Sequence, residues 1–154
     1  MRAAVKRPMR PIKTGSWFAK VPPDHIKIGI SRGNPRGQSG YRLYRALAPG
    51  PWFHSVDAGE YVKRYSAILK ALDPRKVLDD IERLADGRTP VLCCFEPTEG
   101  LVSGTCWCHR SLAAYWLHKT TGVAVEEYGA PGFDPLMIPA FRNLRSAVAG
   151  HISP

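Results

Sequence analysis

The side chains with the greatest capacity for chemistry lie in two short motifs of this 154-residue chain. One is Cys94-Phe-Glu96, at the end of an apolar run. The other is Cys108-His-Arg110, which opens a stretch with apolar residues at helical spacing. Together they supply thiols, a carboxyl, an imidazole and a guanidinium, which can act as nucleophile, proton carrier and anion binder. The two motifs therefore predict a functional site.

The elements expected around these motifs bring the side chains to one helix N-terminus. Residues 90–96 predict a buried strand, and residues 108–119 predict a helix. A helix N-terminus suits an anion and lowers the pKa of a nearby thiol. Glu96, Cys108 and His109 are thus the candidate catalytic residues, with Glu96 as acid or base and Cys108 as nucleophile. Two structural alternatives stay open, namely a buried Cys108 that only shapes the helix start and an ion pair between Glu96 and a neighbouring arginine.

A second candidate segment is the glycine- and proline-containing turn at residues 32–37. It follows a predicted strand, 25–31, in which isoleucines alternate with polar or small residues. Arg32 and Arg36 on this turn are candidate phosphate or carboxylate binders, and an ordinary solvated turn is the alternative. Cys94 and Arg110 from the first site complete the residues that we expect to contact a substrate anion.

The order of the predicted elements indicates the α/β class. Helices are expected at 59–72 and 73–87, before the strand at 90–96, and a last strand is expected at 123–127. We expect a single three-layer domain with a small, mostly parallel sheet and helices on both faces. Ligands bind at the carboxyl ends of strands in such sheets. The turn 32–37 and the segment 94–110 both follow strand ends, so they are expected on one rim.

The chain is expected to divide into three parts. Residues 1–24 form a basic, proline-containing arm with little regular structure, and residues 25–130 form the α/β core domain. Residues 131–154 form a C-terminal extension packed on the core, with a short helix at 138–148. No internal repeat is visible.

The charge of the chain favours an acidic partner. The formal net charge is +9 and the sequence pI is about 9.7. Nucleic acid or a nucleotide is the first candidate partner, although a basic arm is also typical of a solvated tail. No apolar run is long enough to span a bilayer and no signal peptide is evident, so we expect a cytoplasmic protein without a membrane partner.

The four cysteines lie close together in the sequence, at positions 93, 94, 106 and 108. Without a secretory signal this pattern argues against a disulfide framework. Zinc is the competing explanation, with thiolates from Cys94, Cys106 and Cys108 and the imidazole of His109. The spacing argues against it, because one residue separates one cysteine pair and none separates the other. We therefore expect no metal and no other cofactor.

These landmarks together resemble domain-of-unknown-function family 488. The resemblance covers roughly residues 25–128 and rests on the 32–37 turn, Tyr41, the Tyr61-x3-Tyr65 pair, Cys94-x-Glu96 and Cys108-His-Arg110. It implies that Tyr41 joins the substrate-binding residues and that the two cysteine motifs are the hallmark of the site. Two departures are the longer loop with Cys106 and Trp107 and the basic N-terminal arm. The family has no settled activity, so the resemblance implies fold and site more than reaction.

Three functions follow from these features. The leading hypothesis is a small enzyme that binds a phosphorylated or nucleotide-like substrate at this rim. The alternatives are a non-catalytic nucleic-acid-binding module, which uses the basic arm and the rim arginines, and a structural zinc-binding domain. The enzyme hypothesis depends on the turn 32–37 and the segment 94–110 meeting in space.

Overall fold

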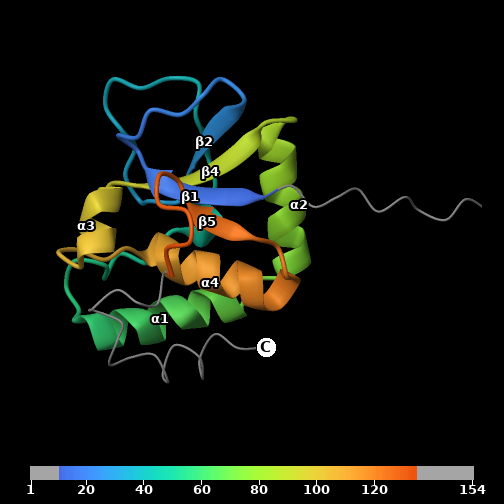
Figure 1. The fold of residues 1–154 in the computed structure, drawn as a ribbon. Coiled ribbons are helices and arrows are strands. Elements are labelled where there is room, and N and C mark those ends of the chain that lie inside the picture. The colour runs from blue at the N-terminus through green and yellow to red at the C-terminus, as the bar shows by residue number, and fades with distance from the viewer. Residues whose placement is uncertain (1–10, 135–154) are drawn as a thin grey trace, which may run out of the picture.

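The computed structural model describes residues 11–134 and contains one five-stranded parallel sheet in the order β3-β2-β4-β1-β5 (Figure 1). Its strands are β1 (Ile12–Ser16), β2 (His25–Gly29), β3 (Arg42–Leu43), β4 (Thr89–Cys94) and β5 (Val125–Glu127). Its helices are the 3-10 helix η1 (Arg45–Leu47), α1 (Ala58–Lys70), α2 (Pro74–Ala85), α3 (Thr98–Ser103) and α4 (His109–Thr121). The expected α/β class and parallel sheet are confirmed.

Strand β1 corrects the expectation that residues 1–24 are irregular. It lies between β4 and β5 and pairs in parallel with both. The side chains that it turns toward the helices are Ile12, Thr14 and Ser16, all buried. Only the first is strongly apolar, so the alternation that marks a strand is weak and the pairing partners decide the conformation. Residues 1–10 of the arm and residues 135–154 of the extension, with its expected helix at 138–148, lie outside the described residues.

The helices share one face of the sheet. Side chains of α1, α2, α3 and α4 form one core cluster with Ile26, Ile28, Leu92 and Cys94. Figure 1 shows α1 and α4 on one side of the sheet and loops on the other. Helices were expected on both faces, but in the described residues the second face is covered by loop side chains. The connection from β1 to β2 spans only residues 17–24, which is too short for a crossover helix.

The loop-covered face has a small core built around Trp17. This fully buried indole packs with Val91 and Cys93 and donates from Nε1 to Ser31 Oγ at 2.9 Å. The strand position beneath the indole is Gly29, where a Cβ would lie 2.8 Å from Trp17 Cη2 and 2.9 Å from Leu43 Cδ2. Glycine is therefore needed there for close packing. In the described part of the chain no helix is both long and apolar enough to cross a membrane.

One polar contact joins the segment after β3 to helix α2. The hydroxyl of Tyr44 donates to Asp80 Oδ2 at 2.8 Å, and Lys76 and Arg83 form ion pairs with the same carboxylate. The hydrogen bond from Tyr44, followed by that from Lys76, lowers the pKa of Asp80 to about 2. These contacts favour the charged form of a buried carboxyl.

Replacing Gly29 with alanine is expected to lower the free energy of unfolding by about 1–3 kcal/mol, because the added methyl group overpacks the Trp17 core. Gly59→Ala is the matched control, since a Cβ there meets Asp57 Oδ1 at an ordinary 3.5 Å. In an exposed helix this control change raises stability by up to about 1 kcal/mol. Urea unfolding of both variants measures the difference. Equal stabilities would contradict the packing described for Gly29.

The contribution of Asp80 is expected to depend on pH. Its pKa in the folded protein, about 2, lies below the ordinary value of 3.8, so its stabilisation is present above pH 4 and is lost as the pH falls toward 2. Asp80→Asn therefore lowers the melting temperature at pH 7 and changes it much less at pH 2. Asp79→Asn, next to it in α2, controls for the loss of a carboxyl. If Asp80→Asn lowered the melting temperature equally at pH 7 and pH 2, the contribution of Asp80 to stability would not depend on its ionisation.

Candidate functional site

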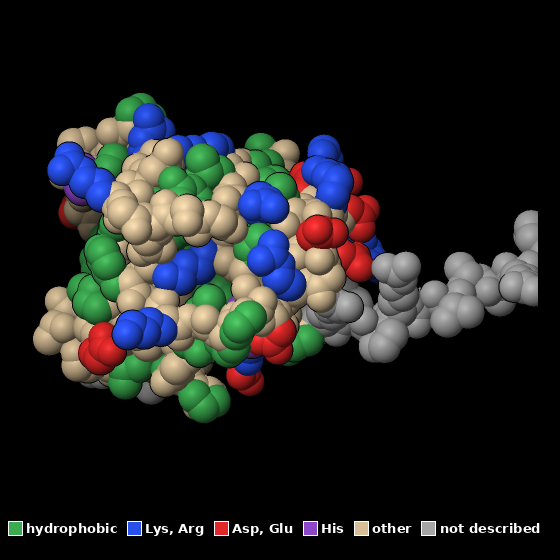
Figure 2. Space-filling model, turned by 90° about the horizontal axis from the view of Figure 1, so that it is seen from above, with side chains coloured by type: hydrophobic (Ala, Val, Ile, Leu, Met, Phe, Trp, Pro, Cys, Tyr) green, Lys and Arg blue, Asp and Glu red, His purple; other side chains and the backbone are tan. Residues whose placement is uncertain are grey.

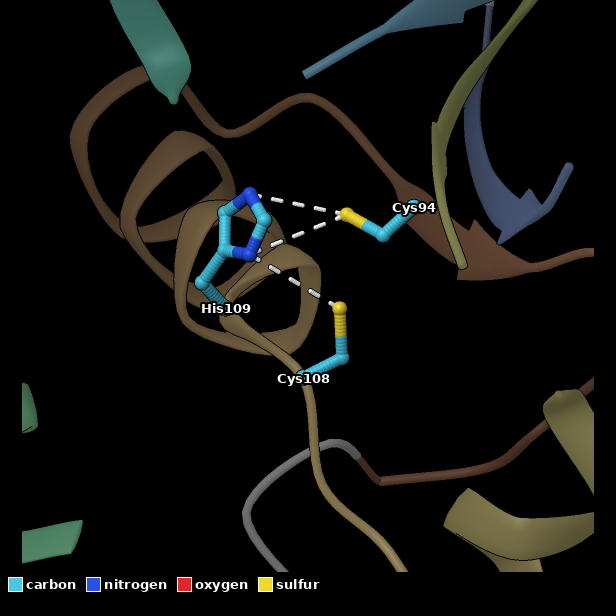
Figure 3. Close-up of side chains that lie close together, drawn as sticks. All are labelled: Cys94, Cys108 and His109. Carbon is cyan, nitrogen blue, oxygen red and sulfur yellow. Dashed lines mark hydrogen bonds between the residues drawn. The ribbon is translucent and has the colours of Figure 1, made fainter. Parts of the chain in front are cut away.

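Two thiols and an imidazole meet where strand β4 ends and helix α4 begins. Cys94 is the last residue of β4, Cys108 is the N-cap of α4, and His109 is its first residue. Figure 3 shows the three side chains pointing toward one another. Cys94 Sγ lies 3.5 Å from Nε2 and 3.8 Å from Nδ1 of His109, and Cys108 Sγ lies 3.8 Å from Nδ1. We call this group, together with Glu96, the cysteine corner.

The imidazole of His109 joins the cysteine corner to the end of strand β2. Its Nε2 lies 2.7 Å from the carbonyl oxygen of Ile30, the residue after β2. Because a carbonyl only accepts, Nε2 carries the hydrogen and Nδ1 is the unprotonated nitrogen of the neutral ring. Burial lowers the pKa of His109. The charge of Cys108 and the contacts of the imidazole with Cys108 and the Ile30 carbonyl outweigh burial, so the pKa of His109 is raised.

The two thiols have opposite pKa shifts. Burial, followed by the hydrogen bond to Cys108, raises the pKa of Cys94 well above its ordinary value. Burial also raises that of Cys108, but the hydrogen bond from Cys94 and the charges of Arg110 and His109 prevail and lower it. The backbone N–H of Arg110, in the first turn of α4, points at Cys108 Sγ over 3.5 Å. The charges of Arg110 and His109 therefore favour the thiolate form of Cys108.

Glu96 is the member of the cysteine corner that reaches the surface. Its side chain is half-buried, whereas Cys94, Cys108 and His109 are only 1%, 1% and 6% exposed. Burial raises the pKa of Glu96 to about 7, helped by the charge of Cys108 and a hydrogen bond with it. The expected ion pair between Glu96 and Arg110 is absent from the described contacts, which instead join Arg110 Nη1 to the backbone oxygen of Glu96 at 2.8 Å.

Arg110 does not offer its guanidinium to a substrate. It is fully buried and binds Glu127 through Nε at 3.0 Å and Nη2 at 2.7 Å. Glu127 also accepts hydrogen bonds from Thr14 at 2.8 Å and from Thr98 at 2.7 Å. The expected anion-binding role of Arg110 is therefore corrected to a structural one. The sequence placed Glu127 at the end of a strand, but nothing in its local pattern identified it as the partner.

The turn 32–37 follows Ile30, whose carbonyl contacts His109 of the cysteine corner. The N–H of Ile30 donates to Cys93 at 3.0 Å, and a Cβ at Gly33 would lie 3.4 Å from the Phe95 ring. Arg32 is exposed, and its Nη1 donates to the carbonyl of Pro49 at 3.1 Å. Arg36 is exposed on the same turn. The two arginines are thus near the rim, while the side chain of Arg32 also braces the neighbouring loop.

Tyr41 lies on the other face of the sheet. Its ring packs edge-on against Trp17 with centroids 5.1 Å apart, in the small loop-covered core. Cys94 turns toward the helices, on the opposite face. The substrate-binding role that the family resemblance implied for Tyr41 is therefore corrected to packing.

An aromatic cluster stands next to the cysteine corner. The Tyr61 ring contacts Trp107 at 4.6 Å and Trp52 at 5.1 Å between centroids, nearly perpendicular to each. Burial, followed by the charges of Cys108 and Cys94, raises the pKa of Tyr61, which places its hydroxyl in the electrostatic reach of the thiols. The sequence marked Tyr61 only through the Tyr61-x3-Tyr65 pair and did not identify it as a neighbour of the thiols.

Two surface cavities, of about 1110 and 890 Å³, lie elsewhere on the described residues. The first follows α2 near Leu78 and Glu82, and the second lies over the loop-covered face near Phe18 and Lys27. Neither is lined by a residue of the cysteine corner. The chemistry-bearing residues and the large cavities are therefore separate features.

The comparisons with protein-family models, curated proteins and solved structures found no match for this chain. The resemblance to domain-of-unknown-function family 488 thus rests on the quoted motifs alone.

Loss of the buried guanidinium is expected to destabilise the protein strongly. Arg110→Met leaves the carboxylate of Glu127 buried without its cation, which costs about 3–5 kcal/mol. The double variant Arg110→Met/Glu127→Leu is expected to recover much of that loss, because no unpaired charge is left.

The neighbouring surface pair provides the control for this prediction. Lys13 and Glu126 are 3.2 Å apart and partly exposed, so Lys13→Met costs at most about 1 kcal/mol. Denaturant unfolding of the wild type, Arg110→Met, Glu127→Leu and the double variant measures the coupling, and Lys13→Met is measured beside them. Strictly additive effects of the Arg110 and Glu127 changes would contradict a coupled buried pair.

Proposed function

We propose that this protein is a small enzyme whose reaction takes place at the cysteine corner, on a substrate with a phosphorylated or nucleotide-like group. The observation that carries this proposal is the convergence of three chain segments at one end of a parallel sheet. The ends of β2 and β4 and the start of α4 are joined there through His109, Ile30 and Cys94. Ligand sites of α/β proteins lie at the carboxyl ends of such strands.

The carboxyl of Glu96 is assigned to proton transfer with the substrate. Among the four members of the cysteine corner it is the one that is not buried. Its raised pKa, about 7, which burial and the charge of Cys108 cause, suits a group that takes up and releases a proton near neutral pH. The sequence made Cys108 and His109 candidates for direct catalysis. Both are buried, so we assign them an indirect role, in which the charge of Cys108 helps to raise the pKa of Glu96.

The substrate class follows from the groups around the corner. Arg32 and Arg36 provide positive charge on the adjacent turn, while Arg110 is committed to Glu127. The rings of Trp52 and Trp107 provide apolar faces that suit a nucleobase. A cytoplasmic location is part of the same proposal.

The nucleic-acid-binding alternative finds less support. Residues 1–10 of the basic arm lie outside the described residues. Figure 2 shows Lys and Arg side chains scattered over the face that it presents rather than gathered along one track. A phosphate backbone is usually followed by a continuous basic stripe or patch.

Glu96→Gln is expected to lower kcat/KM by about 10²–10⁴-fold, because a positioned proton carrier contributes that much. The measurement is turnover of a panel of nucleotides and phosphate esters, followed by chromatography of the products. Glu99→Gln is the matched control, since it makes the same change at an exposed carboxyl of α3 and should leave turnover unchanged. Equal turnover by the wild type and Glu96→Gln would refute the assigned role, and a panel without any turnover would refute the enzyme.

A further inference from the structure

We infer from the geometry that Cys94, Cys108 and His109 bind one zinc ion. The site lies in the buried part of the cysteine corner. The Sγ atoms of both cysteines and a ring nitrogen of His109 all lie within 4.8 Å of one another. Thiolate sulfur and imidazole nitrogen are the ligands that zinc prefers.

The distances between the ligand atoms fit tetrahedral zinc. With zinc–sulfur and zinc–nitrogen bonds of about 2.3 and 2.0 Å, sulfur and nitrogen ligands of one tetrahedral ion lie roughly 3.6 Å apart. Nδ1 of His109 lies 3.8 Å from Cys94 Sγ and 3.8 Å from Cys108 Sγ. Small side-chain movements suffice to close the three atoms around one ion.

The surroundings orient the ligands for a metal. The carbonyl of Ile30 holds the hydrogen of His109 on Nε2, so the nitrogen left with a lone pair is Nδ1, which lies 3.8 Å from each sulfur. Such a contact to the outer nitrogen is typical of zinc-bound histidine. The backbone N–H of Arg110 points at Cys108 Sγ, and the side chain of Arg110 is fixed by Glu127. Two of the three ligands are therefore held before a metal binds.

Charge balance supports the same conclusion. Binding releases the protons of the two thiols and leaves a neutral imidazole, so that two thiolates compensate one Zn²⁺. The result is a group without net charge in a site where Cys94 and Cys108 are each 1% exposed. A lone buried thiolate has no such compensation.

The sequence argument against zinc was based on two local pairs of cysteines, 93 with 94 and 106 with 108, which do not correspond to the proposed ligand pair. Cys106 is not part of the cluster, since its Sγ lies 3.9 Å from the carbonyl of Pro97. Cys93 turns to the loop-covered face, with its Sγ 3.3 Å from the carbonyl of Val91. The ligand pair is instead Cys94 and Cys108, one at a strand end and one at a helix start, so the close spacing within each local pair does not bear on the site.

A ligand set of two cysteines and one histidine leaves room for a fourth ligand. Glu96 does not belong to the group of atoms within 4.8 Å of one another, which Cys94, Cys108 and His109 make up. Zinc with three protein ligands is typical of catalytic sites, in which water takes the open position. This role for the metal rests on the proposed enzyme function, under which Glu96 accepts the proton of that water. Metal binding itself does not depend on it.

The test is the zinc content of the full chain purified without chelator. We expect about one zinc ion per chain, the number that a single set of three protein ligands holds. Zinc is expected to fall to near zero in Cys94→Ser and Cys108→Ser and to stay unchanged in Cys93→Ser and Cys106→Ser. Folded wild-type protein without zinc that takes up none when it is added would overturn the inference, as would full zinc content in the double variant of Cys94 and Cys108.

Cobalt substitution keeps the test decisive if the serine variants do not fold. Co²⁺ added to chelator-treated wild-type protein is expected to give thiolate-to-cobalt charge transfer and the intense visible bands of tetrahedral cobalt. The weak spectrum of six-coordinate cobalt would contradict the site. Full zinc binding without turnover of any compound supports this inference and refutes the enzyme function. Turnover that persists in fully zinc-free protein refutes the catalytic role of the metal and supports the enzyme function, while the zinc content alone decides whether the site binds metal.

Discussion

The buried ion pair between Arg110 and Glu127 is the interaction on which the rest of the site depends. Through it the first turn of α4 is fixed to the end of β5, and Glu127 in turn binds Thr14 of β1 and Thr98 of α3. The same guanidinium holds the backbone of Glu96. One charged group thus sets where the strand end and the helix start meet. The free-energy cost of burying the Arg110 guanidinium is offset by its ion pair with Glu127 and by the hydrogen bond from Nη1 to the backbone oxygen of Glu96.

Three consecutive residues at the start of α4 have three different tasks. Cys108 caps the helix and presents its sulfur to the interior, His109 reaches across to Ile30, and Arg110 fixes the helix to β5. Successive side chains at a helix start point in different directions, which lets one short motif join the sheet, the turn and the cysteine corner. Glu96, two residues beyond Cys94, is half-buried, whereas the thiols and the imidazole are buried.

The sequence was sufficient for the elements with strong patterns. The helices at Ala58–Lys70 and Pro74–Ala85 lie within a few residues of their expected positions, because an aspartate N-cap and an apolar stripe mark each one. Strand β1 was missed because threonine, glycine and serine supply little hydrophobic alternation. The cysteine motifs identified the corner correctly, but the partner of Arg110 depends on pairing of β5 with β1, which no local pattern encodes. Tyr41 was misassigned for the same reason, since its face of the sheet is decided by the packing of Trp17.

We infer that the two thiols and the imidazole bind one metal ion together, rather than lie in the interior as separate side chains. X-ray absorption at the zinc edge of the purified protein tests it most directly, because it reports the ligand atoms themselves. The account predicts two sulfur neighbours at about 2.3 Å, one imidazole nitrogen at about 2.0 Å and one further light ligand. A first shell that contains only oxygen and nitrogen would contradict it.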